Sequence, residues 1–239
     1  MQGRVEVVED SAALARAAAD RFVARLAQVH GRQAVCLTGG GTPETLYRLL
    51  ATDAYRSRIP WKDIHWFWTD ERFVSARDPL NNARMAIDAL LDHAPVPAEN
   101  IHRIPTSVPG PVESARLYEE ALRQFHGQDS LDAGRPLFSL VLMGMGRDGH
   151  TASLFPGKPE VDEKQRWAVA VPEAGMEPYV PRVSLTLPAL GSSREMLFLV
   201  SGADKRDALR RIRSGEDLPA ASAHSDGEAA WLVDRAAAG

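Results

Sequence analysis

Apolar residues along the chain fall into two alternating patterns. Over the first thirty residues they recur at helical spacing, at Leu14, Ala18, Phe22, Leu26 and Val29. This spacing predicts a helix that begins after Asp10 or Ser11, both suitable N-caps, and ends by Gly31. The next apolar run, 34–37, is short and continuous, which is typical of a buried strand.

The same alternation continues to the end of the chain. It predicts strands at 64–68, 100–104, 137–143, 167–171, 183–187 and 196–200, and an edge strand at 231–233. Helices are predicted from Asn81 or Asn82, over 112–125 and over 203–212. Strands that alternate with helices indicate an α/β sheet with helices on both faces. The Pro- and Gly-rich stretch 105–111 reads as a loop, because the alternation resumes beyond it, so we expect one domain over 1–239.

Composition excludes several classes of protein. The 239 residues carry a net charge of −4, which disfavours a nucleic-acid binder that works by neutralising phosphates. No apolar run approaches the roughly 18 residues of a membrane span, and the first residues do not resemble a signal peptide. The single cysteine, Cys36, rules out an internal disulfide and suits a reducing compartment. We therefore expect a cytoplasmic protein with no nucleic-acid or membrane partner.

Polar residues gather where four predicted strands end. Glycines follow 34–37, Asp70 to Arg72 follow 64–68, Asp148 and His150 follow 137–143, and Lys205 follows 196–200. In open α/β sheets the ligand site lies outside the carboxyl ends of the strands. The convergence of four strands on one rim is stronger evidence for a site than any single motif.

The glycine run Gly39-Gly40-Gly41-Thr42-Pro43 joins a strand to a helix, with Thr42 as the expected cap and Pro43 in the first turn. Backbone N–H groups at such a bend can surround an anion, and a helix N-terminus favours negative charge. The run therefore predicts a phosphate cradle. The alternative is a tight turn without a ligand; a P-loop is excluded because no Gly-Lys-Ser/Thr follows.

A second glycine pattern, 144–149, has the letters of a dinucleotide fingerprint and follows a strand. That fingerprint requires a long helix directly after it. Pro156 and Gly157 would end any such helix within about two turns, so we reject a nicotinamide site.

His150 lies just beyond these glycines. Asp148 could bind one ring nitrogen and fix the tautomer, which would leave the other nitrogen as a general base. The alternative is a histidine that only caps or packs at the turn.

The charged groups Asp70-Glu71-Arg72, Arg182 and Lys205 are each ambiguous. A charged triplet on a loop is usually only solvated, and Arg182 and Lys205 could be ordinary surface charges. Together with the glycine cradle, the cationic groups Arg182 and Lys205 would form a site for a phosphorylated anion. Cys36 lies within an apolar strand and is expected to be an inert buried thiol. No metal-binding motif is present, and we predict no metal.

These residues resemble the glucosamine-6-phosphate isomerase/6-phosphogluconolactonase family, and the lactonase branch of it. The resemblance rests on Leu37 to Pro43, Trp68 to Val74 with Asn81-Asn82, and above all Met143 to Gly157. Pro181 to Leu187 and Ser201 to Lys205 extend it, so that it covers about residue 5 to residue 234. It implies a three-layer, Rossmann-like α/β/α fold with a mostly parallel sheet, shared with sugar-phosphate deaminases and isomerases.

The resemblance also implies an activity: hydrolysis of 6-phospho-D-glucono-1,5-lactone to 6-phosphogluconate, the second step of the oxidative pentose phosphate pathway, without a cofactor. A deaminase is the nearest alternative. Its pattern places a glutamate where this chain has Phe155, which disfavours it. A non-catalytic sugar-phosphate sensor is the third possibility, although a sensor has no use for an Asp148–His150 pair.

The expected roles are as follows. Gly39, Gly40, Gly41, Thr42 and Asp70 line the substrate site, Arg182 and Lys205 hold the phosphate, Arg72 polarises the lactone carbonyl, His150 is the base and Asp148 orients it. The only partner expected is the small phosphorylated lactone, bound by a monomer or a weak homodimer.

Overall fold

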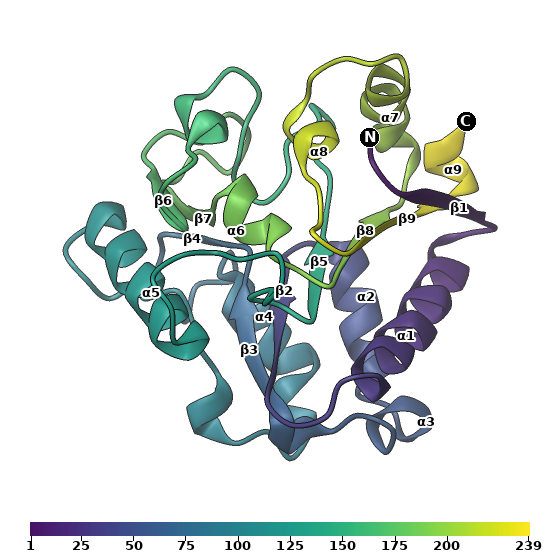
Figure 1. The fold of residues 1–239 in the computed structure, drawn as a ribbon. Coiled ribbons are helices and arrows are strands. Elements are labelled where there is room, and N and C mark those ends of the chain that lie inside the picture. The colour runs from purple at the N-terminus through teal and green to yellow at the C-terminus, as the bar shows by residue number, and fades with distance from the viewer.

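The computed structural model describes residues 1–239 and is built on a six-stranded sheet whose neighbouring strands are all parallel (Figure 1). The strand order is β1-β9-β8-β5-β2-β3. The strands are β1 (Arg4–Val8), β2 (Gln33–Leu37), β3 (Ile64–Trp68), β5 (Leu140–Met143), β8 (Glu195–Val200) and β9 (Glu228–Asp234). The predicted α/β class with a mostly parallel sheet is confirmed.

The order of strands reverses between β2 and β5. From β2 the chain passes outward to β3, and then returns to the other side of β2 to form β5, β8 and β9. A crevice opens beyond the carboxyl ends of two strands at such a switch point, and ligands of open α/β sheets bind there. The topology therefore favours a site beyond Leu37 and Met143.

Helices cover both faces of the sheet, as the alternating side chains of β3 show. On one face Phe22 of α1 (Ser11–Ala27) stacks on Trp66 with ring centroids 6.3 Å apart, and α2 (Gly41–Leu50) packs beside α1. On the other face Phe67 meets Phe125 of α5 (Pro111–His126) edge-on. Successive strand residues point to opposite faces, so the apolar run of β3 is buried on both sides.

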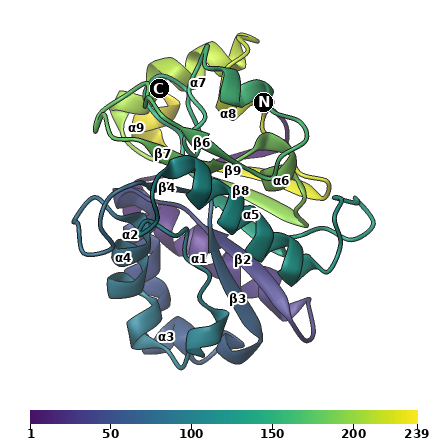
Figure 2. The ribbon, with the colours of Figure 1, turned by 90° about the vertical axis from the view of Figure 1, so that its left-hand side faces the viewer.

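A second, three-stranded antiparallel sheet lies beside α5, in the order β4-β7-β6 (Figure 2). Its strands are β4 (Asp70–Arg72), β7 (Arg182–Leu185) and β6 (Ala168–Val171). The pattern of apolar residues in the sequence does not predict this sheet. The segment 70–72, expected as a loop, is a strand. The strands predicted at 167–171 and 183–187 are confirmed as strands, but they pair in this small sheet and not in the main parallel sheet. Short strands of this kind are specified by long-range pairing rather than by local pattern.

Three further expectations need correction. The segment 100–104 is not a strand, since it makes only one bridge, from Ile101 to Trp66. The strand that contains Trp231 is not an edge strand, because β1, which was not predicted, pairs with its outer side. Gly40 rather than Thr42 occupies the N-cap of α2.

The remaining helices are short. They are α3 (Asp53–Arg56), α4 (Asn82–Ala89), α6 (Leu187–Gly191), α7 (Arg206–Arg213), α8 (Pro219–Ser222) and α9 (Arg235–Ala238). The predicted caps of α1 and α4 are confirmed: Asp10 accepts a hydrogen bond from the Ala13 N–H at 2.7 Å, and Asn81 from the Arg84 N–H at 2.8 Å. None of the helices has the length and apolar character needed to cross a membrane.

Candidate active site

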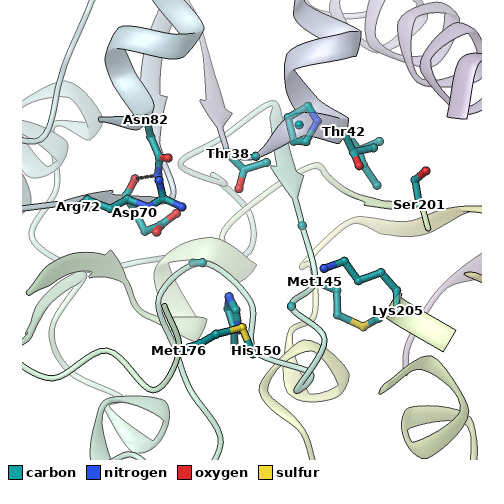
Figure 3. Close-up of a pocket in the computed structure, with 18 of the residues that line it drawn as sticks. Thr38, Thr42, Asp70, Arg72, Asn82, Met145, His150, Met176, Ser201 and Lys205 are labelled. Atoms are coloured by element: carbon teal, nitrogen blue, oxygen red, sulfur yellow. Dashed lines mark hydrogen bonds between the residues drawn. The ribbon is translucent and has the colours of Figure 1, made fainter. Parts of the chain in front are cut away.

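A cavity of about 250 Å³ opens at the carboxyl ends of β2, β3, β5 and β8 (Figure 3). Nine of the ten predicted site residues line it: Gly39, Gly40, Gly41, Thr42, Asp70, Arg72, His150, Arg182 and Lys205. The tenth, Asp148, lies directly behind His150. A concave site of this size suits a small molecule. The expectation that His150 and the glycine bend face the same cavity is confirmed.

The glycine bend forms one wall of the cavity, and its three glycines differ in what a side chain at each position would meet. Gly40 has φ +108°, a backbone conformation that side chains rarely allow. A Cβ on Gly39 would lie 2.0 Å from the Asn82 side-chain oxygen. A Cβ on Gly41 would meet nothing within 4 Å. The protein itself therefore does not explain the missing side chain at Gly41, whereas a ligand in the cavity would.

The N-terminus of α2 forms part of this wall. Its cap residue, Gly40, makes no side-chain hydrogen bond to the first turn. The first N–H groups of a helix lack partners within the helix and carry the positive end of its dipole. They are therefore available to an anion in the cavity.

The Asp148–His150 pair has the geometry of an oriented base. Nδ1 of His150 lies 2.6 Å from a carboxylate oxygen of Asp148, and the His150 N–H donates to the same oxygen at 3.1 Å. The ring of Phe155 supports the imidazole, with centroids 4.6 Å apart. Burial alone would raise the pKa of Asp148, but its hydrogen bond with His150 and the charge of that ring lower it. An ionised carboxylate on Nδ1 leaves Nε2 for the cavity.

Gly146 makes room for this pair. A Cβ at that position would lie 2.1 Å from Nδ1 of His150 and 2.7 Å from the Asp148 carboxylate. The glycine of 144–149 that the dinucleotide pattern would assign to a cofactor therefore serves the histidine. No helix follows it, as expected; residues 151–154 form a tight turn.

The small sheet brings two arginines together. Arg72 of β4 and Arg182 of β7 are directly opposite each other in the antiparallel ladder, and both line the cavity. Directly opposed like charges destabilise a sheet unless something compensates them. Burial, together with the charge of Arg72, lowers the pKa of Arg182, while Asp70 acts in the other direction. Negatively charged or polarised ligand oxygens beside the two guanidinium groups would offset this repulsion.

The contacts of the two arginines differ. Arg182 donates to the carbonyls of Val180 at 3.2 Å and Pro178 at 2.7 Å, so part of its guanidinium holds the preceding loop. Arg72 donates from Nη1 to the Leu80 carbonyl at 2.8 Å, while its buried Nε–H has no partner. A buried donor without an acceptor is costly, so Arg72 is held in this position at an energetic penalty.

Asp70 is buried, although it lines the cavity, and it acts within the protein. One carboxylate oxygen accepts the Ser153 hydroxyl at 2.6 Å, and the other accepts the Thr69 hydroxyl at 3.1 Å. Its carbonyl accepts the Asn82 side-chain amide at 3.1 Å, the contact drawn in Figure 3. Asp70 therefore ties the small sheet to the turn after His150 and to α4.

Glu71 is a residue that the sequence analysis left without a role. Its carboxylate is almost fully buried and accepts the N–H groups of Arg72, Asn82 and Ala83 at 2.7 to 2.8 Å. Burial raises the pKa of Glu71 to about 7, against the effect of these donors. Glu71 thus fixes β4 to the start of α4. The contact joins residues eleven positions apart, and no spacing rule in the sequence predicts it.

Lys205 and Ser201 lie on the opposite side of the cavity from Arg72, beside Thr42 and Met145 (Figure 3). Lys205 pairs with Asp204 at 3.0 Å and stands where a 3-10 turn (Ala203–Lys205) leads into α7. Sequence reasoning gave no role to the lining residues Thr38, Asn82, Met145 and Met176. Met176 comes from the loop between β6 and β7 and lies beside His150 (Figure 3). Among the described residues, no group of three or more His, Cys, Asp or Glu side chains is placed to hold a metal ion.

Comparison with protein families finds a match over most of the chain. Residues 9–231 match the model described as glucosamine-6-phosphate isomerases/6-phosphogluconolactonase. The chain belongs to the glucosamine-6-phosphate isomerase/6-phosphogluconolactonase family.

Individual members of the family agree with this assignment along the whole chain. A 6-phosphogluconolactonase from Nostoc sp. is 38% identical over 244 residues, which cover 99% of this chain and 98% of the relative. The crystal structure of 6-phosphogluconolactonase from Thermotoga maritima superimposes with a TM-score of 0.84 at 30% identity, over 98% of this chain and 100% of that one. A monomeric glucosamine-6-phosphate deaminase superimposes with a TM-score of 0.82 over 98% of both chains, but at 22% identity it shows only that the fold is shared.

Proposed function

We propose that this protein is a 6-phosphogluconolactonase, which hydrolyses 6-phospho-D-glucono-1,5-lactone to 6-phosphogluconate in the oxidative pentose phosphate pathway. Relatives named for this activity match nearly the full chain. The observation that carries the proposal is the Asp148–His150 pair in one cavity with the glycine bend, two arginines and a lysine. A phosphorylated ester needs an anion site and a base, and this cavity offers both.

The phosphate binds to the cationic part of the cavity in this proposal. The N–H groups at the start of α2, Lys205 and Arg182 hold it, while Gly41 leaves the space that it fills. Arg72, which lines the cavity, donates to the carbonyl oxygen of the lactone. This donor stabilises the charge that develops on that oxygen in the transition state.

The chemistry follows from the orientation of His150. Nε2 takes a proton from water, and the water oxygen forms a bond to the lactone carbonyl carbon. The bond from that carbon to the ring oxygen then breaks, and protonated His150 returns its proton to the ring oxygen. Asp148 holds Nδ1 throughout and stabilises the imidazolium. The product is a carboxylic acid, which ionises and releases one proton at neutral pH.

The deaminase reading fits the cavity less well. The position expected for its glutamate is Phe155, which is buried and packs against both His150 and, at 6.0 Å, Arg182. An apolar ring at that position cannot transfer protons for ring opening and isomerisation. A single base and water are sufficient for an ester.

Acid release after addition of freshly prepared phosphorylated lactone tests the proposal, with the spontaneous rate subtracted. We expect rapid release of one proton per lactone and no ammonia from glucosamine 6-phosphate. Ammonia release would favour the deaminase. Binding of the lactone without acceleration of acid release would favour a sensor.

We further propose that the enzyme acts in the cytoplasm as a monomer or weak homodimer. The single buried Cys36 is compatible with a reducing compartment. Sedimentation at micromolar concentration measures the oligomeric state directly.

A further inference from the structure

Asp234, the last residue of β9, reaches a wall of the cavity from a strand that contributes no lining residue. It is 4% exposed, and its carboxylate binds two consecutive residues of the turn after β8. The Ser201 hydroxyl donates to one oxygen at 2.5 Å, and the Gly202 N–H lies 3.1 and 3.2 Å from the two oxygens. The Ala237 N–H donates at 2.8 Å, so the same carboxylate caps α9.

This contact fixes the direction of the Ser201 hydroxyl. A serine hydroxyl has one proton and two lone pairs, and here the proton is committed to Asp234. Ser201 lines the cavity, so it presents lone pairs to a ligand. Phosphate oxygens only accept at neutral pH, whereas sugar hydroxyls donate. Ser201 is therefore suited to a hydroxyl of the substrate and unsuited to its phosphate.

The contact with Gly202 fixes the turn that carries Lys205. Gly202 has φ +104°, and its carbonyl accepts the Lys205 N–H at 3.1 Å. Without Asp234 the Gly202 N–H would lose its partner at the residue where the backbone turns toward Lys205. The carboxylate thus restrains both cavity-lining residues of this wall.

We propose that Asp234 is a positioning residue of the active site, which holds the Lys205 turn and makes Ser201 an acceptor for a substrate hydroxyl. The inference rests on the proposed lactonase function. Nothing in the reaction requires Asp234 to touch the lactone, because it acts through Ser201 and Gly202.

Asp234→Asn tests the proposal with little change in volume. The side-chain oxygen of asparagine can keep the Gly202 and Ala237 N–H groups, while its amide nitrogen replaces the oxygen that Ser201 binds. The nitrogen then donates to Ser201, and the hydroxyl proton turns into the cavity. We expect KM for the phosphorylated lactone to rise about tenfold and kcat to change less than about twofold.

Ser201→Ala provides the second corner of a double-mutant cycle. Loss of the acceptor should raise KM about fivefold, and Ser201→Thr, which keeps the hydroxyl, should restore it. If Asp234 acts through Ser201, the double variant has a KM no higher than Asp234→Asn alone. KM effects that multiply, or an Asp234→Asn variant with the KM of wild type, would overturn the proposal.

A chain that ends at Ala236 separates the cap of α9 from the active-site role. It lacks the Ala237 N–H but keeps Ser201 and Gly202, and we expect the KM of wild type. A rise in KM equal to that of Asp234→Asn would assign the effect to α9 and contradict the proposal. Absence of lactone hydrolysis by the wild-type protein would instead contradict the proposed function itself, so the two failures are distinguishable.

Discussion

At the scale of single residues, the cavity is shaped as much by missing side chains as by those present. Gly146 leaves space for the Asp148–His150 pair, Gly39 for Asn82, and Gly41 for no protein atom. At a glycine that makes room for a neighbouring side chain, an added methyl group would displace that side chain. At a glycine that makes room for a ligand, the methyl group would obstruct binding instead. Substitution at these positions therefore tests the proposed catalytic pair and the proposed binding wall separately.

Gly146→Ala should damage catalysis more than folding. The added Cβ would collide with Nδ1 of His150 at 2.1 Å, and the ring can swing away at the cost of its bond to Asp148. We expect kcat to fall by about 10², with thermal unfolding within a few degrees of wild type. Gly110→Ala is the control, because its Cβ meets nothing within 4 Å and the residue does not line the cavity, so kcat should stay intact. Equal kcat for both variants would refute this role of Gly146.

Substitution of each of the two opposed arginines should change a different kinetic constant. Arg182→Ala removes the proposed phosphate ligand and should raise KM about tenfold or more with a smaller effect on kcat. Arg72→Ala removes the proposed donor to the carbonyl oxygen and should lower kcat by about 10². Steady-state kinetics on the phosphorylated lactone measure both values. The opposite pattern would exchange the roles of the two residues.

At the scale of elements, helices and long strands were predictable from the sequence, whereas the small sheet was not. The helix after Asp10 is specified by a cap and an apolar stripe, both of which are local. Asp70–Arg72 becomes a strand only because Arg182 to Ser184, more than a hundred residues later, pairs with it. The strand Arg4–Val8 was missed because it is only five residues long and has no continuous apolar run.

The same difference between local and long-range signals applies to the residues of the site. Apolar runs in the sequence show where the strands end, so it could be predicted that these residues meet in one cavity. Glu71 and Asp234 were not foreseen, because their partners lie on other elements and no spacing rule connects them. The opposition of Arg72 and Arg182 depends on the register of the unpredicted sheet.

The N-terminus of α2 offers a test of ligand space at an element boundary. Gly41→Ala places a methyl group in open cavity and adds a better helix former, so the free energy of unfolding should not decrease. KM for the lactone should rise about tenfold. Gly110→Ala, also without a neighbour within 4 Å but at the start of α5, should leave KM unchanged. An unaltered KM in Gly41→Ala would mean that no ligand occupies this space.

At the scale of the whole molecule, we propose that residues 1–239 form one domain. A single cluster of 60 buried apolar residues includes side chains from both sheets, such as Val183 of β7 and Phe67 of β3. Shared burial of this kind couples the parts during unfolding. We expect denaturant to unfold the chain in one transition.

A histidine pair should make the stability of the molecule depend on pH. Nδ1 of His65 lies 2.9 Å from Nε2 of His102, and His102 stacks on Phe67. Burial, aided by the charges of His65 and Arg32, lowers the pKa of His102 to about 4. Between pH 6.5 and 4 the unfolded chain therefore binds a proton that the folded chain refuses, and stability falls as the pH falls.

After a discount for solvent screening, we expect this group to contribute about 1–2 kcal/mol to the change. Urea unfolding at pH 6.5 and 4.5 measures it, with His102→Gln as the variant that cannot titrate. The loss of stability on acidification should be smaller in the variant. An identical loss in both proteins would show that the pair does not control it.

The central claim is that the His150 imidazole, held by Asp148, activates water in the cavity. The most direct test is kcat of His150→Ala for the phosphorylated lactone, measured by acid release beside wild type. We predict a fall of about 10²–10⁴ with KM within a few-fold, because the anion site is untouched. A His150→Ala enzyme that retains the wild-type kcat would contradict the account.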